Sequence, residues 1–164
     1  MLAIIIPYYK IEFFEDTLKS LSSQIDKRFN VYIGNDSGPF DPESLLSEYS
    51  LNYTYKKFEK NLGSISLVKQ WGRCLEMVKE EAWVMLLGDD DVLGEDVVAE
   101  FYKNIEEIKK QNINVTRFAS QKINAKNDIT SILYKHPVIE KSTDFIFRSS
   151  RSSLSEYIFK KEQI

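Results

Sequence analysis

The chain contains an unbroken apolar run, residues 83–87 (Trp-Val-Met-Leu-Leu), that stops at Gly88 and three consecutive aspartates, residues 89–91. A short apolar run without alternation, bounded by such a break, predicts a strand that is buried on both faces of a sheet. In an open α/β sheet, ligands bind outside the carboxyl ends of such strands. The run therefore favours an α/β fold and marks the three carboxylates as a candidate ligand site.

The three carboxylates suggest a metal. Asp89 and Asp91 point to the same side if strand geometry continues, because side chains alternate along a strand. Two oxygen ligands on one side suit Mg²⁺ or Mn²⁺ that also holds phosphate oxygens. Three adjacent carboxylates repel one another, so the site needs a positive charge nearby. The alternative is an acidic turn that caps the next helix, since Asp is favoured in both places; the triplet alone leaves both open.

Two earlier apolar segments, residues 2–6 and 29–33, predict further strands, the first ended by Pro7. The segment between them predicts an amphipathic helix, with apolar residues at helical spacing: Phe14, Leu18, Leu21 and Ile25. Strand, helix and strand at this spacing form a βαβ unit, so the two strands are expected to be parallel. The carboxyl ends of three strands then meet at one sheet edge, with Pro7, Tyr8, Asn35, Asp36 and the aspartates.

The rest of the chain continues this alternation. We expect a short helix at residues 43–48, a strand at 51–57, and a helix opened by the turn at 60–64. The apolar face expected for that helix is Leu67, Val68, Trp71, Cys74, Leu75 and Val78. A helix that starts near Glu95 and Asp96 carries the stripe Val97, Val98, Phe101, Ile105 and Ile108. Beyond it, we expect strands at 112–120, 129–134 and 156–160 and a helix at 140–147.

Composition narrows the classes of function. A chain of 164 residues is expected to form one domain. The net charge of −3 argues against general affinity for nucleic acid. The single cysteine excludes an internal disulfide and agrees with a reducing compartment. No glycine-rich phosphate loop follows the first strand, which disfavours a dinucleotide enzyme or a P-loop phosphotransferase.

The residues at the predicted sheet edge suit a nucleotide with a metal beside it. Asp36 can accept hydrogen bonds from a base, Tyr8 or Tyr9 can lie against a ring, and Asn61 can bond a base or ribose. The metal would bridge the aspartates and a diphosphate, with Asp90 beside the ribose or behind the ligands. Arg73 either reaches a phosphate or faces solvent. Trp71 is expected in the core.

Four sequence blocks, in order, resemble family-2 glycosyltransferases of the GT-A fold. The first block is Ile4-Ile5-Ile6-Pro7-Tyr8-Tyr9-Lys10, and the second is Gly34-Asn35-Asp36-Ser37. The third, Asn61-Leu62-Gly63 with Trp71-Gly72-Arg73-Cys74-Leu75-Glu76, is similar to bacterial polysaccharide-synthesis members. The fourth, Leu87-Gly88-Asp89-Asp90-Asp91-Val92-Leu93, matches the family's Asp-x-Asp region. The departures are Lys10 for Asn, Asn35 for the first Asp of its pair, and Gly72 for Asn.

The resemblance implies a single α/β GT-A domain over residues 1–164, a mostly parallel, Rossmann-like sheet flanked by helices. It implies metal-dependent, inverting transfer of a sugar from a nucleoside-diphosphate sugar to a glycan or lipid-linked glycan, in bacterial surface polysaccharide synthesis. The expected donor-binding residues are Pro7, Tyr8, Tyr9, Asp36, Asn61, Arg73, Asp89 and Asp90, and the expected metal ligands are Asp89 and Asp91. The resemblance also implies that the domain is truncated before the acceptor region, so the catalytic base is expected beyond Ile164. It further implies a cytoplasmic location, at the cytoplasmic face of the membrane, with weak peripheral association.

Three alternatives stay open from the sequence. A sugar-nucleotide nucleotidyltransferase has a similar nucleotide-binding half but usually carries a glycine-rich loop, and residues 7–10 contain none. A receiver-type phosphoacceptor domain has an acidic pocket, but its order of elements does not fit. A non-catalytic module that binds a nucleotide sugar is the strongest alternative, because the acceptor region has no counterpart in the chain.

Overall fold

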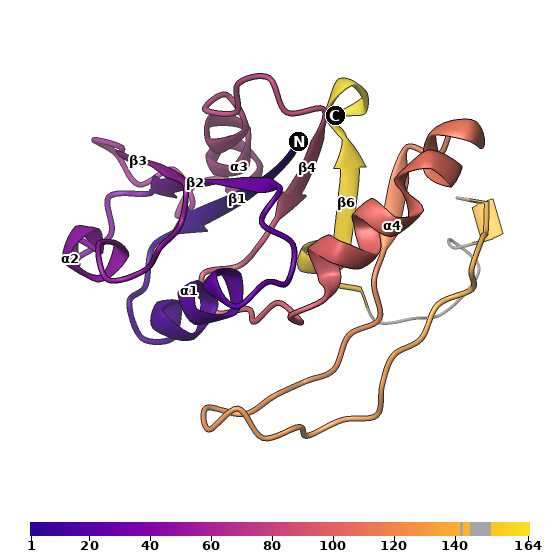
Figure 1. Ribbon diagram of the computed structural model, residues 1–164. Coiled ribbons are helices and arrows are strands. Elements are labelled where there is room, and N and C mark those ends of the chain that lie inside the picture. Colours follow the sequence, from indigo (N-terminus) through magenta and orange to yellow (C-terminus); the bar gives the residue numbers. More distant parts are fainter. Residues whose placement is uncertain (142, 145–151) are drawn as a thin grey trace.

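The computed structural model describes residues 1–141, 143–144 and 152–164. Its centre is a six-stranded sheet in the order β3-β2-β1-β4-β6-β5 (Figure 1). The strands are β1 Leu2–Tyr8, β2 Phe29–Asn35, β3 Tyr53–Lys57, β4 Trp83–Leu86, β5 Val115–Arg117 and β6 Tyr157–Lys160. The helices are α1 Phe14–Ser22, α2 Glu43–Leu46, α3 Leu67–Leu75 and α4 Val97–Lys110, with 3-10 turns η1 Leu154–Glu156 and η2 Lys161–Gln163.

Strands β1 to β4 are mutually parallel where they pair, as the βαβ pattern predicts. The antiparallel strand β6 is inserted between β4 and β5. The register pairs Tyr8 with Asn35 and Ile5 with Leu86. The carboxyl ends of β1, β2 and β4 therefore meet at one edge, as expected.

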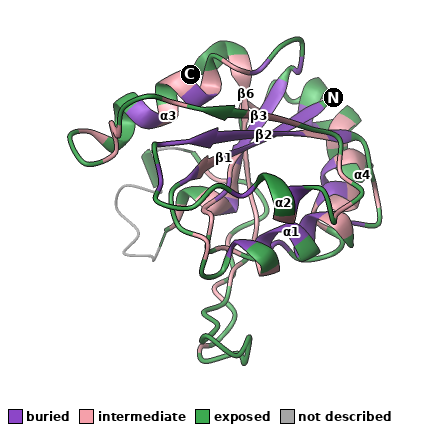
Figure 2. Ribbon diagram, turned by 90° about the vertical axis from the view of Figure 1, so that its left-hand side faces the viewer, coloured by how far each residue is buried: buried purple, intermediate pink, exposed green. Residues whose placement is uncertain are grey.

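Helices cover both faces of the sheet, and Figure 2 shows α3 on one side and α1, α2 and α4 on the other. Alternate residues of β1 divide between the two cores. Leu2, Ile4, Ile6 and Tyr8 pack against α1, α2 and α4. Ala3 and Ile5 pack on the side of Cys74 and Val78. This confirms that β1 is buried on both faces.

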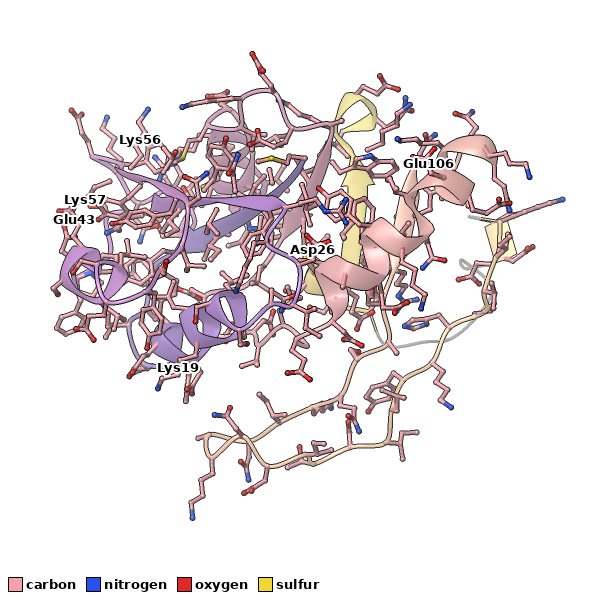
Figure 3. The ribbon with its side chains drawn as sticks, in the orientation of Figure 1. Lys19, Asp26, Glu43, Lys56, Lys57 and Glu106 are labelled. Carbon is pink, nitrogen blue, oxygen red and sulfur yellow. The ribbon has the colours of Figure 1, made fainter. Side chains whose placement is uncertain are left out.

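The helices α1 and α4 bury most of the residues predicted from their spacing, including Phe14, Leu18 and Phe101. Ile25 is an exception: α1 ends at Ser22, and Ile25 is 67% exposed. Charged side chains such as Lys19 and Glu106 point outward from these helices, and Lys56 and Lys57 line the edge strand β3 (Figure 3). Lysines on an edge strand hinder pairing with another chain.

The predicted face of α3 was wrong in part. Leu67 and Val68 are 58% and 71% exposed, whereas Gln70 and Cys74 are buried. The reason is a specific polar contact, since the Gln70 amide nitrogen donates to the Gly34 carbonyl at 3.1 Å. An unpaired carbonyl under a helix is costly, so a polar side chain faces the sheet there.

Residues 118–139 leave the sheet after β5 and form an extended excursion that projects from the body (Figure 1). Its two arms meet only at isolated bridges, Ser120 with Tyr134 and Ile123 with Ile129. The strand predicted at 129–134 is therefore absent from this described segment. The helix predicted at 140–147 lies largely outside the described residues. Within the described parts of the chain, no helix combines the length and apolar character needed to cross a membrane.

Candidate functional site

A cleft of about 570 Å³ lies at the carboxyl ends of the parallel strands. This size is typical of sites for small ligands. The predicted site residues Pro7, Tyr9, Asp36, Asn61 and Asp89 all line it. Residues near the end of the chain, Ser153, Leu154 and Ser155, complete its wall. The prediction that Pro7, Asp36 and Asp89 share one cleft is confirmed.

Asp36 follows β2 directly and is held by three donors. The backbone N–H groups of Leu62 and Gly63 each donate to its carboxylate at 2.7 Å, one to each oxygen. Arg73 of α3 forms an ion pair with the same carboxylate. Asp36 is only 4% exposed. The carboxylate is therefore anchored, and it forms part of the cleft wall.

Arg73 serves Asp36. Its guanidinium also donates to the Lys60 carbonyl at 2.9 Å and lies over the ring of Phe58, 3.9 Å from the centroid. Arg73 does not line the cleft. The predicted direct contact of Arg73 with a phosphate is corrected accordingly: its charge is used to balance a buried carboxylate, which needs a partner when removed from water.

Tyr8 also needs correction. It is fully buried, its ring packs 4.7 Å from that of Phe14, and its hydroxyl donates to the Phe40 carbonyl at 3.2 Å. Burial raises the pKa of Tyr8 to about 12, with the charge of Asp89 as a further cause. Tyr8 therefore packs in the core under the cleft, and of the two neighbouring tyrosines it is Tyr9, 40% exposed, that lines the cleft.

Trp71 was expected in the core, but it lines the cleft and is half-buried. This position of Trp71 results from the orientation of α3, which turns Gln70 toward the sheet. Asn61 shapes the turn at the cleft mouth, where its side-chain oxygen accepts the N–H of Ser64 at 2.8 Å. Gly63 is required beside Asp36, since a Cβ there would lie 2.5 Å from the Asp36 carboxylate.

Asn35, a departure from the family pattern, lies beneath the site. It is fully buried, with its oxygen accepting the N–H of Gly38 at 2.8 Å and its nitrogen donating to the Tyr55 hydroxyl at 2.8 Å. These contacts shape the loop after β2. Asn35 does not line the cleft.

The three aspartates after β4 have different surroundings. Asp89 accepts the backbone N–H groups of Tyr9 and Lys10, both at 2.8 Å, and so ties the end of β4 to the end of β1. Asp91 accepts a hydrogen bond from the Ser155 hydroxyl. The pKa of Asp90 is raised by desolvation of its carboxyl group and then by the charges of Asp91 and Asp89. Asp90 and Asp91 lie beside the cleft without lining it.

Among residues 1–141, 143–144 and 152–164, no three acidic, histidine or cysteine side chains are grouped to hold a metal. The donors of the acidic turn are nevertheless all carboxylate oxygens, which suit Mg²⁺ or Mn²⁺. Mg²⁺ is usually held by one or two carboxylates together with substrate phosphates. The turn therefore fits a metal that arrives with a diphosphate, with Asp89 and Asp91 as its predicted ligands.

The sequence missed Ser155. It lies 64 residues beyond Asp91 and is brought to the acidic turn by η1. Its hydroxyl also accepts the N–H of Gly88 at 3.2 Å. No local pattern marks such a residue, since a serine before a short strand is ordinary.

The mostly parallel sheet, with an anchored aspartate after β2 and an acidic turn after β4, is the GT-A fold. Residues 3–158 match the family described as glycosyl transferase family 2, and the chain belongs to this family. A search of curated proteins found no match.

Solved structures of S. aureus TarS have the same fold. TarS 1-349 matches with a TM-score of 0.72 and 18% identity, over 98% of this chain and 47% of that chain. Its complex with UDP-GlcNAc matches with a TM-score of 0.71 and 17% identity, over 98% and 45% of the two chains. The complex with UDP gives 0.70 and 18%, over 98% and 46%. The present chain thus spans about half the length of these TarS chains.

Proposed function

We propose that this chain binds a nucleoside-diphosphate sugar in the cleft and transfers the sugar to a glycan acceptor. The observation that carries the proposal is the meeting of Asp36 and Asp89 in one cleft, on a chain that belongs to glycosyl transferase family 2. The complexes of TarS with UDP-GlcNAc and UDP support a nucleotide sugar as the ligand.

Different residues of the cleft are suited to contact different parts of the donor. Asp36 offers a fixed acceptor for a base N–H, and its carboxylate is held in place by Arg73 and two backbone amides. Tyr9 and Trp71 offer aromatic surface, and Asn61 offers an amide for the base or ribose. Fixed groups cost little reorganisation when a ligand binds.

Asp89 and Asp91 would hold Mg²⁺ or Mn²⁺, which would neutralise the charge of the departing diphosphate. In the proposed reaction, the acceptor hydroxyl loses its proton to a base and its oxygen bonds to the anomeric carbon. The bond from that carbon to the diphosphate breaks, and the nucleoside diphosphate leaves with the bonding electrons. We assign no base within residues 1–164. Surface polysaccharide as the acceptor, and the cytoplasmic membrane face as the place of reaction, stay predictions.

A second candidate function is binding of a nucleotide sugar without catalysis, because the cleft residues assigned above contact the donor and none of them is assigned as a base. Both functions share the donor cleft, so they are separated by turnover and not by binding. Release of nucleoside diphosphate from a nucleotide sugar that requires the acceptor indicates transfer, because hydrolysis by water would release it without acceptor.

The test is a thermal-shift panel of UDP, GDP, CDP and dTDP, each with and without Mn²⁺. A ligand that binds only the folded state raises the melting temperature by mass action. We expect one nucleotide to raise it, and more so with Mn²⁺. If none of the four does so under either condition, the proposed donor site is wrong.

A further inference from the structure

Ser155, in η1, forms hydrogen bonds with the acidic turn after β4. Its hydroxyl donates to the Asp91 carboxylate and accepts the N–H of Gly88 at 3.2 Å. A serine hydroxyl has one proton, so the Gly88 contact leaves that proton for Asp91. The donor and acceptor roles of the Ser155 hydroxyl are therefore fixed: its oxygen accepts from the Gly88 N–H, and its proton is donated to the Asp91 carboxylate.

The backbone of Asp91 is already fixed by other contacts. Its N–H donates to the Gly88 carbonyl at 3.3 Å, and its carbonyl accepts the hydroxyl of Thr17 at 2.9 Å. Thr17 is fully buried in α1. With the main chain held in this way, the remaining freedom of Asp91 is in its side chain, and among the described residues it is Ser155 that donates a hydrogen bond to its carboxylate.

The turn is also tightly packed around this carboxylate. A Cβ on Gly88 would lie 2.7 Å from an oxygen of Asp91 and 3.0 Å from one of Asp90. The Asp91 side chain is therefore folded back over Gly88, between the turn and Ser155. Hydrogen bonds from hydroxyls to carboxylates are among the stronger ones in proteins, so this contact has enough strength to select one side-chain orientation.

We propose that Ser155 is a positioning residue that orients Asp91 for binding of the divalent cation together with the nucleoside diphosphate. The inference rests on the proposed function, because it assumes that Asp91 meets the metal–diphosphate pair. Groups that hydrogen-bond to metal ligands commonly control metal affinity by orienting them. Ser155 would do so from η1, in the segment that also supplies the wall residues Ser153 and Leu154.

The test measures binding, not turnover. The nucleotide that stabilises the protein in the panel of UDP, GDP, CDP and dTDP is titrated calorimetrically, once with Mn²⁺ and once with EDTA. In Ser155→Ala we expect the Mn²⁺-dependent gain in nucleotide affinity to fall about tenfold. Because Ser155 also lines the cleft, the decisive quantity is the ratio of the affinities in Mn²⁺ and in EDTA, which isolates the effect that passes through Asp91. Ser155→Thr keeps the hydroxyl and restores the gain to within about threefold of the original protein.

Ser152→Ala is the matched control. Ser152 lies three residues away, is exposed, and shares a 2.7 Å hydrogen bond with the Tyr157 hydroxyl. It should leave both titrations unchanged. A second measurement uses the Asp91→Asn background, in which Ser155→Ala should cause no further loss because the group that it positions has already been altered.

The outcomes separate the two proposals. If the unaltered protein binds none of the four nucleotides, the proposed function fails and this inference fails with it. If the unaltered protein shows the Mn²⁺-dependent gain and Ser155→Ala keeps it, only the positioning role is overturned. Equal losses in Mn²⁺ and in EDTA would also overturn it, since they would indicate a general disturbance of the cleft. If Ser155→Ala does not fold, Ser155→Thr is used alone. Because threonine keeps the hydroxyl, loss of the Mn²⁺-dependent gain in this variant would overturn the positioning role.

Discussion

The guanidinium of Arg73 on α3 pairs with the carboxylate of Asp36 at the end of β2, and their side chains are only 16% and 6% exposed. This pair joins a helix to the sheet edge and holds a charge in the cleft wall. It makes Asp36 a structural residue as well as a candidate contact for the base. Removal of Asp36 is therefore expected to affect the stability of the fold as well as nucleotide binding.

Asp36→Ala should lower the free energy of unfolding by about 3 kcal/mol, because it leaves the shielded Arg73 charge without its partner. It should also weaken nucleotide binding at least tenfold, through loss of a charged acceptor worth about 1.5–3 kcal/mol. Urea unfolding and calorimetry measure the two effects. The matched control is Asp41→Ala, which breaks the exposed ion pair with Lys57 at 3.2 Å and should change stability by less than about 1 kcal/mol. Equal effects of the two variants would contradict this account.

Replacement of two glycines in the same region by alanine should have opposite effects on the stability of the fold. Gly63→Ala places a Cβ 2.5 Å from the Asp36 carboxylate, so it should lower both stability and nucleotide affinity. Gly72 lies inside α3 with open space around it, so Gly72→Ala should stabilise the protein by about 0.5–1 kcal/mol. Thermal unfolding of the two variants tests the pair. A destabilised Gly72→Ala with an unaffected Gly63→Ala would contradict the geometry of α3 and the cleft.

Metal and nucleotide should bind together at the acidic turn. The carboxylates of residues 89–91 repel a diphosphate that arrives alone, so nucleotide affinity should rise with Mn²⁺, and Mn²⁺ affinity should rise by the same factor with nucleotide. Asp91→Asn should reduce this coupling and slightly stabilise the ligand-free protein, since it removes one of three like charges. Calorimetric titrations in Mn²⁺ and in EDTA measure the coupling. Equal affinity under both conditions would mean that the triplet is only a turn before α4.

Alkaline pH should destabilise the fold in part through Cys74. Burial raises the pKa of this thiol from 9.0 to about 12. Above pH 9 the unfolded thiol ionises while the folded thiol keeps its proton, so stability is full below pH 9 and falls until about pH 12. Between pH 9 and 10 this group should lower the unfolding free energy as pH rises, and the slope of that decrease should approach about 1.4 kcal/mol per pH unit.

Cys74→Ala isolates that contribution. The variant loses packing volume and is less stable at neutral pH, but its unfolding free energy should fall less steeply above pH 9. Tyr8 and Tyr55 have pKa values raised to about 12 and add to the loss at higher pH in both proteins. Urea unfolding at pH 8, 9 and 10 gives the comparison. Identical slopes in the two proteins would show that the thiol is not shielded.

Much of the fold could be predicted from the sequence because local hydropathy reports burial directly. The apolar runs of β1 and β4 are buried on both faces, and the stripes of α1 and α4 face the sheet, as their spacing predicts. The rule that parallel strands end at one edge then brought Pro7, Asp36 and Asp89 to the same cleft. These conclusions need only periodicity and connection handedness, both of which are properties of short segments.

The tertiary structure decided which side chains hold others in place. Arg73 and Asp36 are 37 residues apart, Ser155 and Asp91 are 64 apart, and Asp89 and the amide of Tyr9 are 80 apart. The rotation of α3, which exposes Leu67 and turns Trp71 to the cleft, depends on one carbonyl of β2 that Gln70 satisfies. Hydrogen bonds are short and directional, so their partners are defined only when distant segments have been brought together. The sequence by itself therefore determined the parallel part of the sheet and the location of its cleft. Only the folded chain determined the antiparallel insertion of β6 and how the charges of the cleft are held.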